Sequence, residues 1–333
     1  MKLKKVVGRV LLVLLCIVVA IAAVGVAQFY HRSSPKNRKT YPTDNPFITG
    51  ETAVSAHRSG AGDFPEETLA AFRGCAEDPD LQVDYFEFDL HMTADDILVL
   101  SHDATLDRVS DAVSVFGAEG VLVREKTLAE LKQLNMAAQF VTDVGESPYA
   151  GLHGAAVPDE LRILSLDEVL DYLTAAGDYR YIIEIKDGGE TGLAAADQLY
   201  ATLLARGLLD RVIIGSFRDE VAAYITENYP DTHRSASPEE VIRFYLAALT
   251  GKKDFACSYD VLQLPFGRES AGSSYGLNLG TATIINYAHA NDLAIQYWTV
   301  NDEADMAYLA SIGADALITD YPDRAASILS GVQ

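Results

Sequence analysis

The stretch from residue 85 to residue 103, YFEFDLHMTADDILVLSHD, decides how the rest of the chain is interpreted. Its first half predicts a β-strand, in which residues two apart point to the same face. Glu87 and Asp89 therefore share one face of an otherwise apolar strand, where two carboxylates are costly to bury without a positive partner. Because no Lys or Arg lies between Arg73 and Arg108, we expect a bound Mg²⁺ or Ca²⁺ at these carboxylates.

The second half of this stretch adds a histidine. Thr93 to Asp96 predicts a polar turn, and Ile97 to Leu100 predicts a second apolar strand that ends just before His102 and Asp103. Metal-binding carboxylates followed by a histidine indicate metal-assisted chemistry with a general acid or base. A Glu-x-Asp strand and a His-Asp turn are also common structural features when each occurs alone, so the assignment depends on the rest of the chain.

The charge of the chain is unevenly distributed. Its 333 residues carry 26 Lys and Arg against 48 Asp and Glu, for a net charge of −22. Residues 1–39 contain eight of the basic residues and no acidic residue, so the remainder is strongly acidic. Nucleic acid is therefore not an expected partner, because nucleic-acid binding rewards basic surfaces.

The N-terminus contains an unbroken apolar run from Val10 to Ala27. This run approaches the ~20 residues of a membrane-spanning helix and exceeds the roughly 7–15 apolar residues of a signal peptide. We predict an uncleaved membrane anchor over residues 1–30, with cleavage after Ala27 as the alternative, followed by a linker over residues 31–48. The expected location is the cell membrane, with a single pass and an extracellular catalytic domain, although basic residues on both flanks leave the orientation weakly determined.

Strands and helices alternate through the rest of the chain. Strands are predicted over residues 52–56, 85–90, 97–100, 181–186, 211–216, 261–264, 293–300 and 316–319. This alternation predicts a mostly parallel sheet. Polar residues follow many of the strands, as at the active-site end of a (β/α)8 barrel. We therefore predict a TIM-type (β/α)8 barrel over residues 49–331; a doubly wound sheet is the alternative, and the absence of Gly-x-Gly-x-x-Gly after the first strand weakens it.

Two further strand ends carry candidate site residues. Glu184 and Lys186 share a strand face, which suits a third metal carboxylate and a contact to an anionic group, or else an internal ion pair. His57 and Arg58 follow the first predicted strand. A guanidinium suits phosphate because it donates two parallel hydrogen bonds, although Arg58 would also pair with the acidic residues that open the next helix.

Trp298 and the remaining histidines are weighed separately. Trp298 is the only tryptophan, and at a strand end it suits either core packing or an apolar wall beside a substrate. We expect His91 to be structural or exposed and His289 to lie on the exposed side of a helix. The remaining histidines fall in loop-like or linker segments, and they are His31, His153 and His233.

A set of short motifs occurs in a fixed order along the chain. They are Ala56-His57-Arg58, Pro65-Glu66-Glu67-Thr68, Glu87-Phe88-Asp89, Ser101-His102-Asp103 with Asp107-Arg108, Glu184-Ile185-Lys186, Gly215-Ser216-Phe217, Trp298-Thr299-Val300-Asn301, and Gly313-Ala314-Asp315 with Thr319-Asp320-Tyr321-Pro322. In this order and spacing the chain resembles the glycerophosphodiester phosphodiesterases over roughly Thr52 to Leu329. The resemblance implies a TIM-type barrel and a divalent metal, usually Mg²⁺ or Ca²⁺.

The resemblance also implies roles for individual residues. Glu87, Asp89 and Glu184 match the metal carboxylates of the family. His57 and His102 match its general acid–base pair, without indicating which is the acid.

Four other positions match further residues of the family's site. Arg58 and Lys186 match the phosphate contacts, Glu66 matches a glutamate near the metal, and Trp298 matches an aromatic of the pocket wall. Two positions depart from the family, because Ser59 replaces a glycine and Glu67 replaces an asparagine, and both lie beside the expected phosphate site.

The implied activity is metal-dependent hydrolysis of a small glycerophosphodiester to sn-glycerol 3-phosphate and an alcohol. One alternative is lysophospholipase D or phospholipase C-like activity on membrane lipid, which a membrane anchor favours. The other is a binding module without catalysis, which the complete set of five acidic and histidine site residues disfavours.

Overall fold

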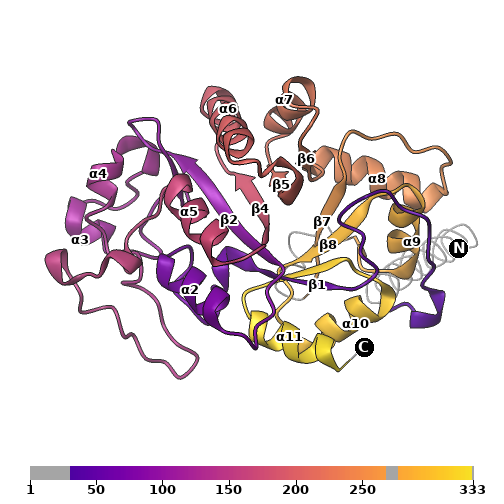
Figure 1. The fold of residues 1–333 in the computed structure, drawn as a ribbon, viewed down its shortest axis with the longest axis horizontal. Helices are drawn as coiled ribbons and strands as arrows, with labels where there is room; N and C mark the ends of the chain where they lie inside the picture. The colour runs from indigo at the N-terminus through magenta and orange to yellow at the C-terminus, as the bar shows by residue number, and fades with distance from the viewer. Residues whose placement is uncertain (1–30, 268–276, 332–333) are drawn as a thin grey trace, which may run out of the picture.

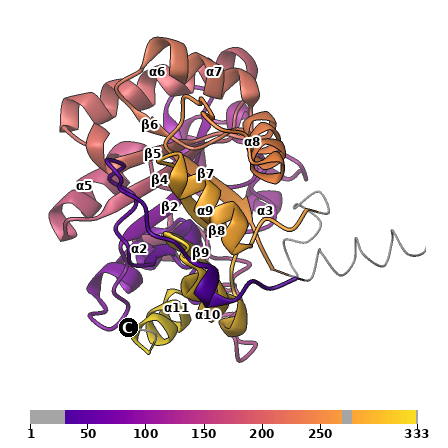
Figure 2. The ribbon, with the colours of Figure 1, turned by 90° about the vertical axis from the view of Figure 1, so that its right-hand side faces the viewer.

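The computed structural model describes residues 31–267 and 277–331. Eight parallel strands in this part of the chain follow one another in the order β6-β5-β4-β2-β1-β9-β8-β7 (Figure 1; β9 is labelled in Figure 2). Their bounds are β1 (Ala53–Ala56), β2 (Tyr85–Met92), β4 (Arg180–Ile185), β5 (Val212–Gly215), β6 (His233–Arg234), β7 (Val261–Pro265), β8 (Ala294–Trp298) and β9 (Ala316–Thr319). A parallel bridge from Ser235 to Val261 links the two ends of the series. The sheet is therefore a nearly closed TIM-type (β/α)8 barrel, as predicted.

The strand predicted over Ile97 to Leu100 is present but lies outside the barrel. It is β3 (Leu98–Leu100), and it pairs antiparallel with the far end of β2. The intervening turn is held by Thr93, whose hydroxyl accepts a hydrogen bond from the Ile97 backbone N–H at 2.9 Å. The hairpin returns the chain to the carboxyl end of β2, directly before His102.

Helices cover the outside of the barrel. They are α2 (Leu69–Glu77), α5 (Leu166–Ala176), α6 (Gly189–Arg206), α7 (Asp219–Asn228), α8 (Pro238–Thr250), α9 (Ala282–Ala290), α10 (Glu303–Ile312) and α11 (Pro322–Ser330). Several begin at a sequence signal: Ser165 and Ser237 each form a capping box, and Pro238 occupies the first turn of α8. Buried aliphatic residues on these helices pack against outward-facing residues of the strands.

The segment between β3 and α5 forms a small unit beside the barrel. It contains α3 (Ala112–Phe116), α4 (Leu128–Leu131) and the short 3-10 helices η3 (Val123–Glu125), η4 (Gly154–Ala156) and η5 (Asp159–Leu161). It has its own apolar cluster, which includes the fully buried Leu106, Leu131 and Leu134. The remaining 3-10 helices are η1 (Pro35–Asn37), η2 (His57–Ser59) and η6 (Leu209–Arg211).

Residues 31–48, which we predicted to be a linker, are packed against the barrel in the structure. We call them the N-terminal strap. The Ser33 backbone N–H donates to the Tyr308 hydroxyl at 2.8 Å, and the Asn45 side chain donates to the backbone carbonyl of Asp260 at 2.8 Å. Phe47 is only 2% exposed and packs against inward-facing residues at the amino ends of the strands. Because an aromatic side chain buries a large apolar area, Phe47 makes the strap part of the folded unit.

The predicted membrane anchor, residues 1–30, lies outside the described residues. In the part of the chain that the structure describes, no helix has both the length and the apolar character needed to cross a bilayer.

Candidate active site

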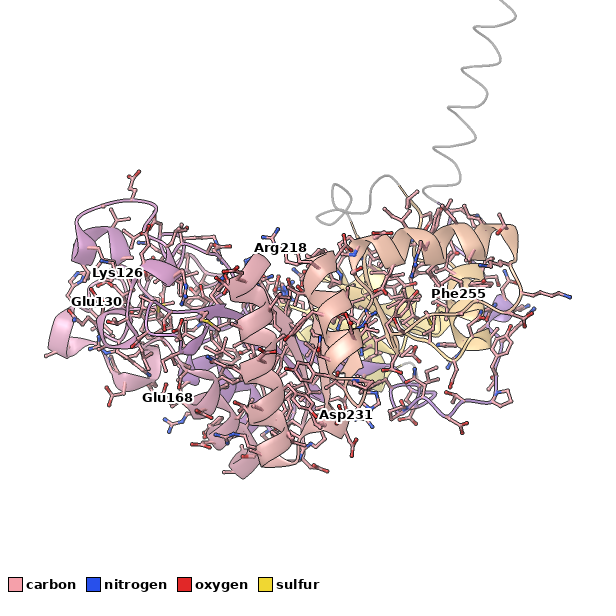
Figure 3. All side chains as sticks on the ribbon, turned by 90° about the horizontal axis from the view of Figure 1, so that it is seen from above. Lys126, Glu130, Glu168, Arg218, Asp231 and Phe255 are labelled. Carbon is pink, nitrogen blue, oxygen red and sulfur yellow. The ribbon has the colours of Figure 1, made fainter. Side chains whose placement is uncertain are left out.

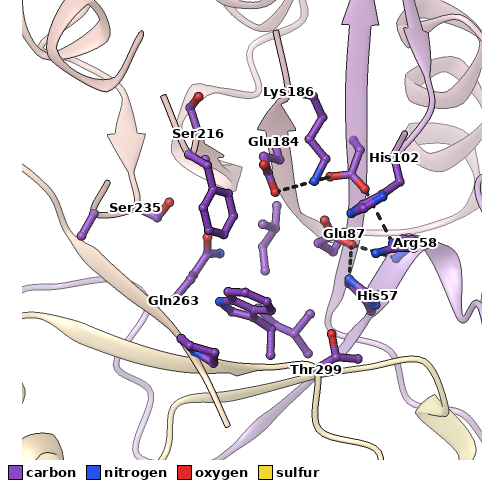
Figure 4. Close-up of a pocket in the computed structure, with 18 of the residues that line it drawn as sticks. His57, Arg58, Glu87, His102, Glu184, Lys186, Ser216, Ser235, Gln263 and Thr299 are labelled. Carbon is purple, nitrogen blue, oxygen red and sulfur yellow. Dashed lines mark hydrogen bonds and ion pairs between the residues drawn. The ribbon is translucent and has the colours of Figure 1, made fainter. Parts of the chain in front are cut away.

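Two neighbouring strands bring three carboxylates together at the carboxyl end of the barrel. Glu87 and Asp89 point inward from β2 and are 5% and 1% exposed. The parallel register places Glu184 of β4 directly opposite Asp89. Oxygens of the three side chains lie within 4.8 Å of one another, and Figure 4 shows two of these residues, Glu87 and Glu184, in the pocket. The alternation of side chains along each strand thus produces the predicted cluster.

Lys186 and Arg58 supply the positive charge beside this cluster. Lys186 Nζ lies 3.0 Å from Asp89 Oδ1 and 3.0 Å from Glu184 Oε2. Burial alone would lower the pKa of Lys186, but the two carboxylates outweigh it and raise the pKa. The Arg58 Nε lies farther away, 3.9 Å from Asp89 Oδ2. The internal ion pair that we considered for Glu184 and Lys186 is therefore present within the pocket.

A left-handed turn directs the chain at Arg58 back toward the carboxylates. Arg58 has φ of 47° and Ser59 has φ of 64°, both in the region that favours glycine. In this turn the Arg58 backbone N–H donates to Glu87 Oε2 at 2.8 Å. The requirement for a positive φ explains why glycine suits position 59 and shows that Ser59 adopts the same conformation at a steric cost.

Each of the two predicted catalytic histidines contacts an aspartate through Nδ1. His57 Nδ1 lies 2.5 Å from Asp320 Oδ1, and Asn301 donates to the other oxygen of Asp320 at 2.7 Å. His102 Nδ1 lies 2.7 Å from Asp103 Oδ1. These contacts orient each ring and direct the Nε2 side toward the pocket, where His57 Nε2 is 4.0 Å from Glu87 Oε2.

The surroundings shift the pKa values of the two histidines in opposite directions. Burial lowers the pKa of His57, but Glu87 and Asp320 outweigh it, so the pKa is raised. Burial also lowers the pKa of His102, and there the nearby Asp89 does not compensate, so the pKa stays below its usual value. Two groups of one type with separated pKa values are suited to opposite roles in proton transfer.

The carboxylate cluster fits a divalent cation. Burial raises the pKa of Glu87 and that of Glu184 to about 7, so in the protein alone these buried acids resist ionisation. Neither oxygen of Asp89 accepts a well-oriented hydrogen bond, although Lys186 Nζ lies 3.0 Å from one of them. Clustered oxygens from three carboxylates, with those of Asp89 under-satisfied, are the donor set that Mg²⁺ and Ca²⁺ take. The candidate ligands are therefore Glu87, Asp89 and Glu184.

The remaining walls of the pocket are largely apolar. The pocket has a volume of about 310 Å³. The rings of Phe217 and Trp298 meet edge to face, with centroids 5.6 Å apart. The predicted aromatic Trp298 thus lines the pocket together with Phe217, which belongs to the motif Gly215-Ser216-Phe217 but had no predicted role. Further apolar lining residues are Ile182, Ala236, Pro238, Val241, Pro265 and Ile318, and four polar ones are Ser216, Ser235, Gln263 and Thr299.

Eight of the nine predicted site residues line this pocket, and Glu66 is the exception. Its two carboxylate oxygens accept hydrogen bonds from Arg108 at 2.7 and 2.8 Å, so Glu66 lies in an ion-pair network beside the cluster. Its neighbour Glu67 is buried, and its Oε1 accepts a hydrogen bond from the Asp89 backbone N–H at 2.7 Å. The sequence did not predict this contact, although it identified Glu67 as a departure from the asparagine that is usual in the family.

Two other histidines are buried and paired. His91 Nδ1 lies 2.6 Å from Asp187, as suits the structural role expected for it. His289 was expected on the exposed side of a helix, and that was wrong: it is 9% exposed, and its Nε2 lies 2.9 Å from Asp315 Oδ2.

The nearly closed barrel, with a charged cluster in the pocket at the carboxyl ends of its strands, places the protein in the TIM-barrel class. Residues 57–324 match the glycerophosphoryl diester phosphodiesterase family. The chain therefore belongs to that family and is an enzyme of its class, a phosphoric diester hydrolase.

Individual relatives agree with this assignment. A glycerophosphodiester phosphodiesterase of Bacillus subtilis is 28% identical over 274 residues, which cover 80% of this chain and 83% of the relative. One from Caldanaerobacter subterraneus is 28% identical over 82% of this chain and 96% of its own length. Two solved structures share the fold. A putative glycerophosphoryl diester phosphodiesterase from Silicibacter pomeroyi has a TM-score of 0.64 at 22% identity, and the match covers 90% of this chain and 98% of that chain. An Oleispira antarctica phosphodiesterase in complex with the product sn-glycerol-3-phosphate has a TM-score of 0.59 at 19% identity, and the match covers 85% of this chain and 99% of that chain.

Proposed function

We propose that this enzyme hydrolyses glycerophosphodiesters to sn-glycerol 3-phosphate and an alcohol. The observation that carries the proposal is the convergence of three buried carboxylates, two oriented histidines and two cationic side chains in one pocket. The membership of the chain in its family and the names of its relatives support the substrate class. Arg58 and Lys186 are the groups that we assign to the substrate phosphate, because each combines a positive charge with hydrogen-bond donors.

We assign the divalent cation, Mg²⁺ or Ca²⁺, to Glu87, Asp89 and Glu184. A cation held there neutralises phosphate charge and lowers the pKa of an oxygen nucleophile. Lys186 contacts two of these carboxylates and Arg58 approaches one, so both cationic side chains border the place where the phosphate would bind. Glu66 acts indirectly, through its ion pairs with Arg108 and Arg58.

The two histidines have the roles of acid and base. His57, whose pKa is raised, donates a proton to the leaving oxygen of the alcohol. His102, whose pKa is lowered, is neutral at physiological pH and accepts the proton of the attacking hydroxyl or water. The attacking group is either water or the glycerol 2-hydroxyl, and in the second case a cyclic phosphate forms and water then opens it. Asp320 and Asp103 keep the two rings in position.

A second candidate activity is hydrolysis of lysophospholipids at the same site. The apolar side of the pocket, formed by Phe217, Trp298, Val241 and their neighbours, favours it, since an acyl chain needs such a wall. A small water-soluble diester has no acyl chain to place against this wall. The chemistry at phosphorus is the same for both substrates, so only the group beyond the phosphate differs.

The membrane location is part of the proposal. The apolar run from Val10 to Ala27 is long enough to anchor the chain with a single pass, and we place the barrel on the extracellular side. The glycerophosphodiester and the bilayer are then the two partners of the protein.

The decisive experiment measures glycerol 3-phosphate release by the full chain in detergent. The substrates are glycerophosphocholine, glycerophosphoethanolamine and lysophosphatidylcholine, each tested with EDTA and after Mg²⁺ or Ca²⁺ is restored. For lysophosphatidylcholine the products to follow are choline and lysophosphatidic acid. We expect metal-restored release from the small diesters. Turnover of lysophosphatidylcholine alone would favour the lipid activity, and metal binding without turnover of any diester would contradict both.

A further inference from the structure

The described chain begins at the same rim of the barrel as the active site. Asn278, in the segment before α9, donates a hydrogen bond to the His31 carbonyl at 2.9 Å. Arg32 pairs with Asp305 in the first turn of α10. Helix α9 is the element that follows β7 along the chain and α10 is the one that follows β8, so the starts of both helices, and these contacts with them, lie on the rim that holds the pocket.

The N-terminal strap then runs from this rim to the opposite end of the barrel. The Lys39 backbone N–H donates to Asn286, within α9, and Asn45 donates to the carbonyls of Asp260 and Asp292, which precede β7 and β8. In the view of Figure 2 the strap is the indigo segment that passes across α9, β8 and β9. The start of the strap is therefore fixed at the rim by its contacts, independently of any residue before it.

The predicted anchor leaves little chain between the bilayer and this rim. The apolar run ends at Ala27, and His31 is already held on the barrel. Four residues span at most about 14 Å even when fully extended. An anchor over residues 1–30 therefore holds the rim with the active site, and not the far end of the barrel, close to the lipid.

Exposed apolar residues gather on the same rim. Phe217, at the pocket, is 51% exposed, and Ile242, Leu246 and Leu249 of α8 are 44%, 56% and 61% exposed. The last three, which we call the α8 stripe, are spaced four and three residues apart and so share one face of the helix. On the helical wheel this face adjoins the side of α8 that lines the pocket with Pro238 and Val241.

Figure 3 shows where α8 lies relative to the rim. Arg218, which follows β5, is at the upper edge of the molecule, and Asp231, which precedes β6, is at the lower edge. The upper edge is therefore the end at which the strands terminate. Helix α8 crosses the upper right of this view, level with that edge rather than with the lower one.

We propose that the mouth of the active site faces the bilayer, with Phe217 and the α8 stripe in contact with the lipid interface. This proposal rests on the proposed anchor. The occupant is a zwitterionic phospholipid surface, because the first turns of α7 and α8 place the exposed acids Asp219, Glu220 and Glu239 at the same rim. Those acids repel anionic headgroups, so apolar contact and the anchor hold the orientation. Diesters then reach the pocket from the membrane surface.

The test places a fluorescent reporter on the α8 stripe in the full chain. The Leu246→Trp variant is reconstituted into phosphatidylcholine vesicles with or without brominated acyl chains, which quench tryptophan on contact. The matched control is Leu204→Trp, because Leu204 is similarly exposed, at 53%, but lies in the last turn of α6. That turn is at the end of the barrel where the strands begin, opposite the rim, which we call the floor. The wild type, with Trp298 as its only tryptophan, gives the background. Ile242→Trp repeats the measurement if the first variant folds poorly.

We expect brominated lipid to quench the tryptophan introduced at position 246 at least several-fold more than the one at position 204. Equal quenching at the two positions would overturn the proposal. So would a reporter at position 246 that is shielded from soluble iodide but not quenched by lipid, which would indicate that a second copy or another segment of the chain covers the stripe. If the full chain does not float with the vesicles, both the proposed anchor and the proposed orientation are wrong. Diester hydrolysis is measured separately on the same preparation, so failure of the proposed activity is distinguishable from failure of the orientation.

Discussion

The two ends of the barrel are built from the same strands but differ in chemistry. On β2 the inward-facing residues run from Tyr85 at the floor to Glu87 and Asp89 at the rim. On β4 they run from Ile182 at the floor to Glu184 at the rim. On each strand the inward face therefore changes from apolar to charged within two residues.

This difference separates the sources of stability and of function. The floor is an apolar cluster closed by Phe47, and burial of such area contributes favourably to folding. The rim buries charges, which costs free energy that ion pairs only partly recover. We therefore expect substitutions at the rim to change activity and substitutions at the floor to change stability.

The largest expected effect is at the rim. We expect His102→Ala to lower kcat for glycerophosphocholine by about 10²- to 10⁴-fold, because it removes the general base. His153→Ala is the control, since its side chain is 64% exposed and lies outside the pocket. Steady-state release of glycerol 3-phosphate measures both. A His102→Ala enzyme within about threefold of the wild type would exclude a catalytic role for this residue.

The corresponding change at the floor is Phe47→Ala. We expect it to lower the free energy of unfolding by about 3–5 kcal/mol through the cavity it leaves, with kcat per folded molecule unchanged. Urea unfolding followed by circular dichroism measures the first quantity. An unchanged midpoint of urea unfolding would show that Phe47 contributes nothing to stability. A reduced kcat in fully folded protein would show that the floor also affects activity.

A smaller effect is expected for Asp320→Asn, which tests the proton donor. Asp320 helps to raise the pKa of His57, so the substitution lowers that pKa. The acid must be protonated, so activity is lost as pH rises through this pKa, and the alkaline limb of the profile moves to lower pH. One pKa unit corresponds to about tenfold in rate on that limb. The acid limb is set by His102, whose pKa is lowered, and we expect it to stay in place. If the acid limb moves instead of the alkaline limb, His57 is the base and His102 is the acid.

The smallest effect is expected at the pocket wall. Phe217→Ala removes a half-exposed ring and its contact with Trp298, so we expect KM to rise roughly 2- to 10-fold, with little change in the free energy of unfolding. The effect on KM is larger for lysophosphatidylcholine than for glycerophosphocholine if the apolar wall holds an acyl chain. Equal effects on the two substrates would assign Phe217 to the shared glycerophosphate part.

Local periodicity made much of the candidate site predictable. The spacing of Glu87 and Asp89, and that of Glu184 and Lys186, determines which side chains face inward, and strand alternation brings the strand ends together. The structure confirms that arrangement. The barrel was predictable for the same reason, because βα alternation is itself a local signal.

Long-range contacts were not predictable in this way. Asp320 is 263 residues from His57, and no pattern within either segment indicates the hydrogen bond that joins them. Phe47 lies in a stretch of proline, asparagine and threonine that is typical of a linker, yet it closes the floor. The burial of His289 depends on Asp315, which lies 26 residues away, directly before β9.

The strap has a practical consequence for recombinant production. A fragment trimmed to the predicted domain boundary at residue 49 lacks Phe47 and leaves the inward-facing Tyr85, Ile182 and Ile213 open to water at the floor. Exposed apolar surface of this kind promotes aggregation, so we expect such a fragment to be poorly soluble in spite of an intact set of catalytic residues. A fragment beginning near His31 lacks the predicted anchor but retains the whole strap, so it is the truncated form to crystallise.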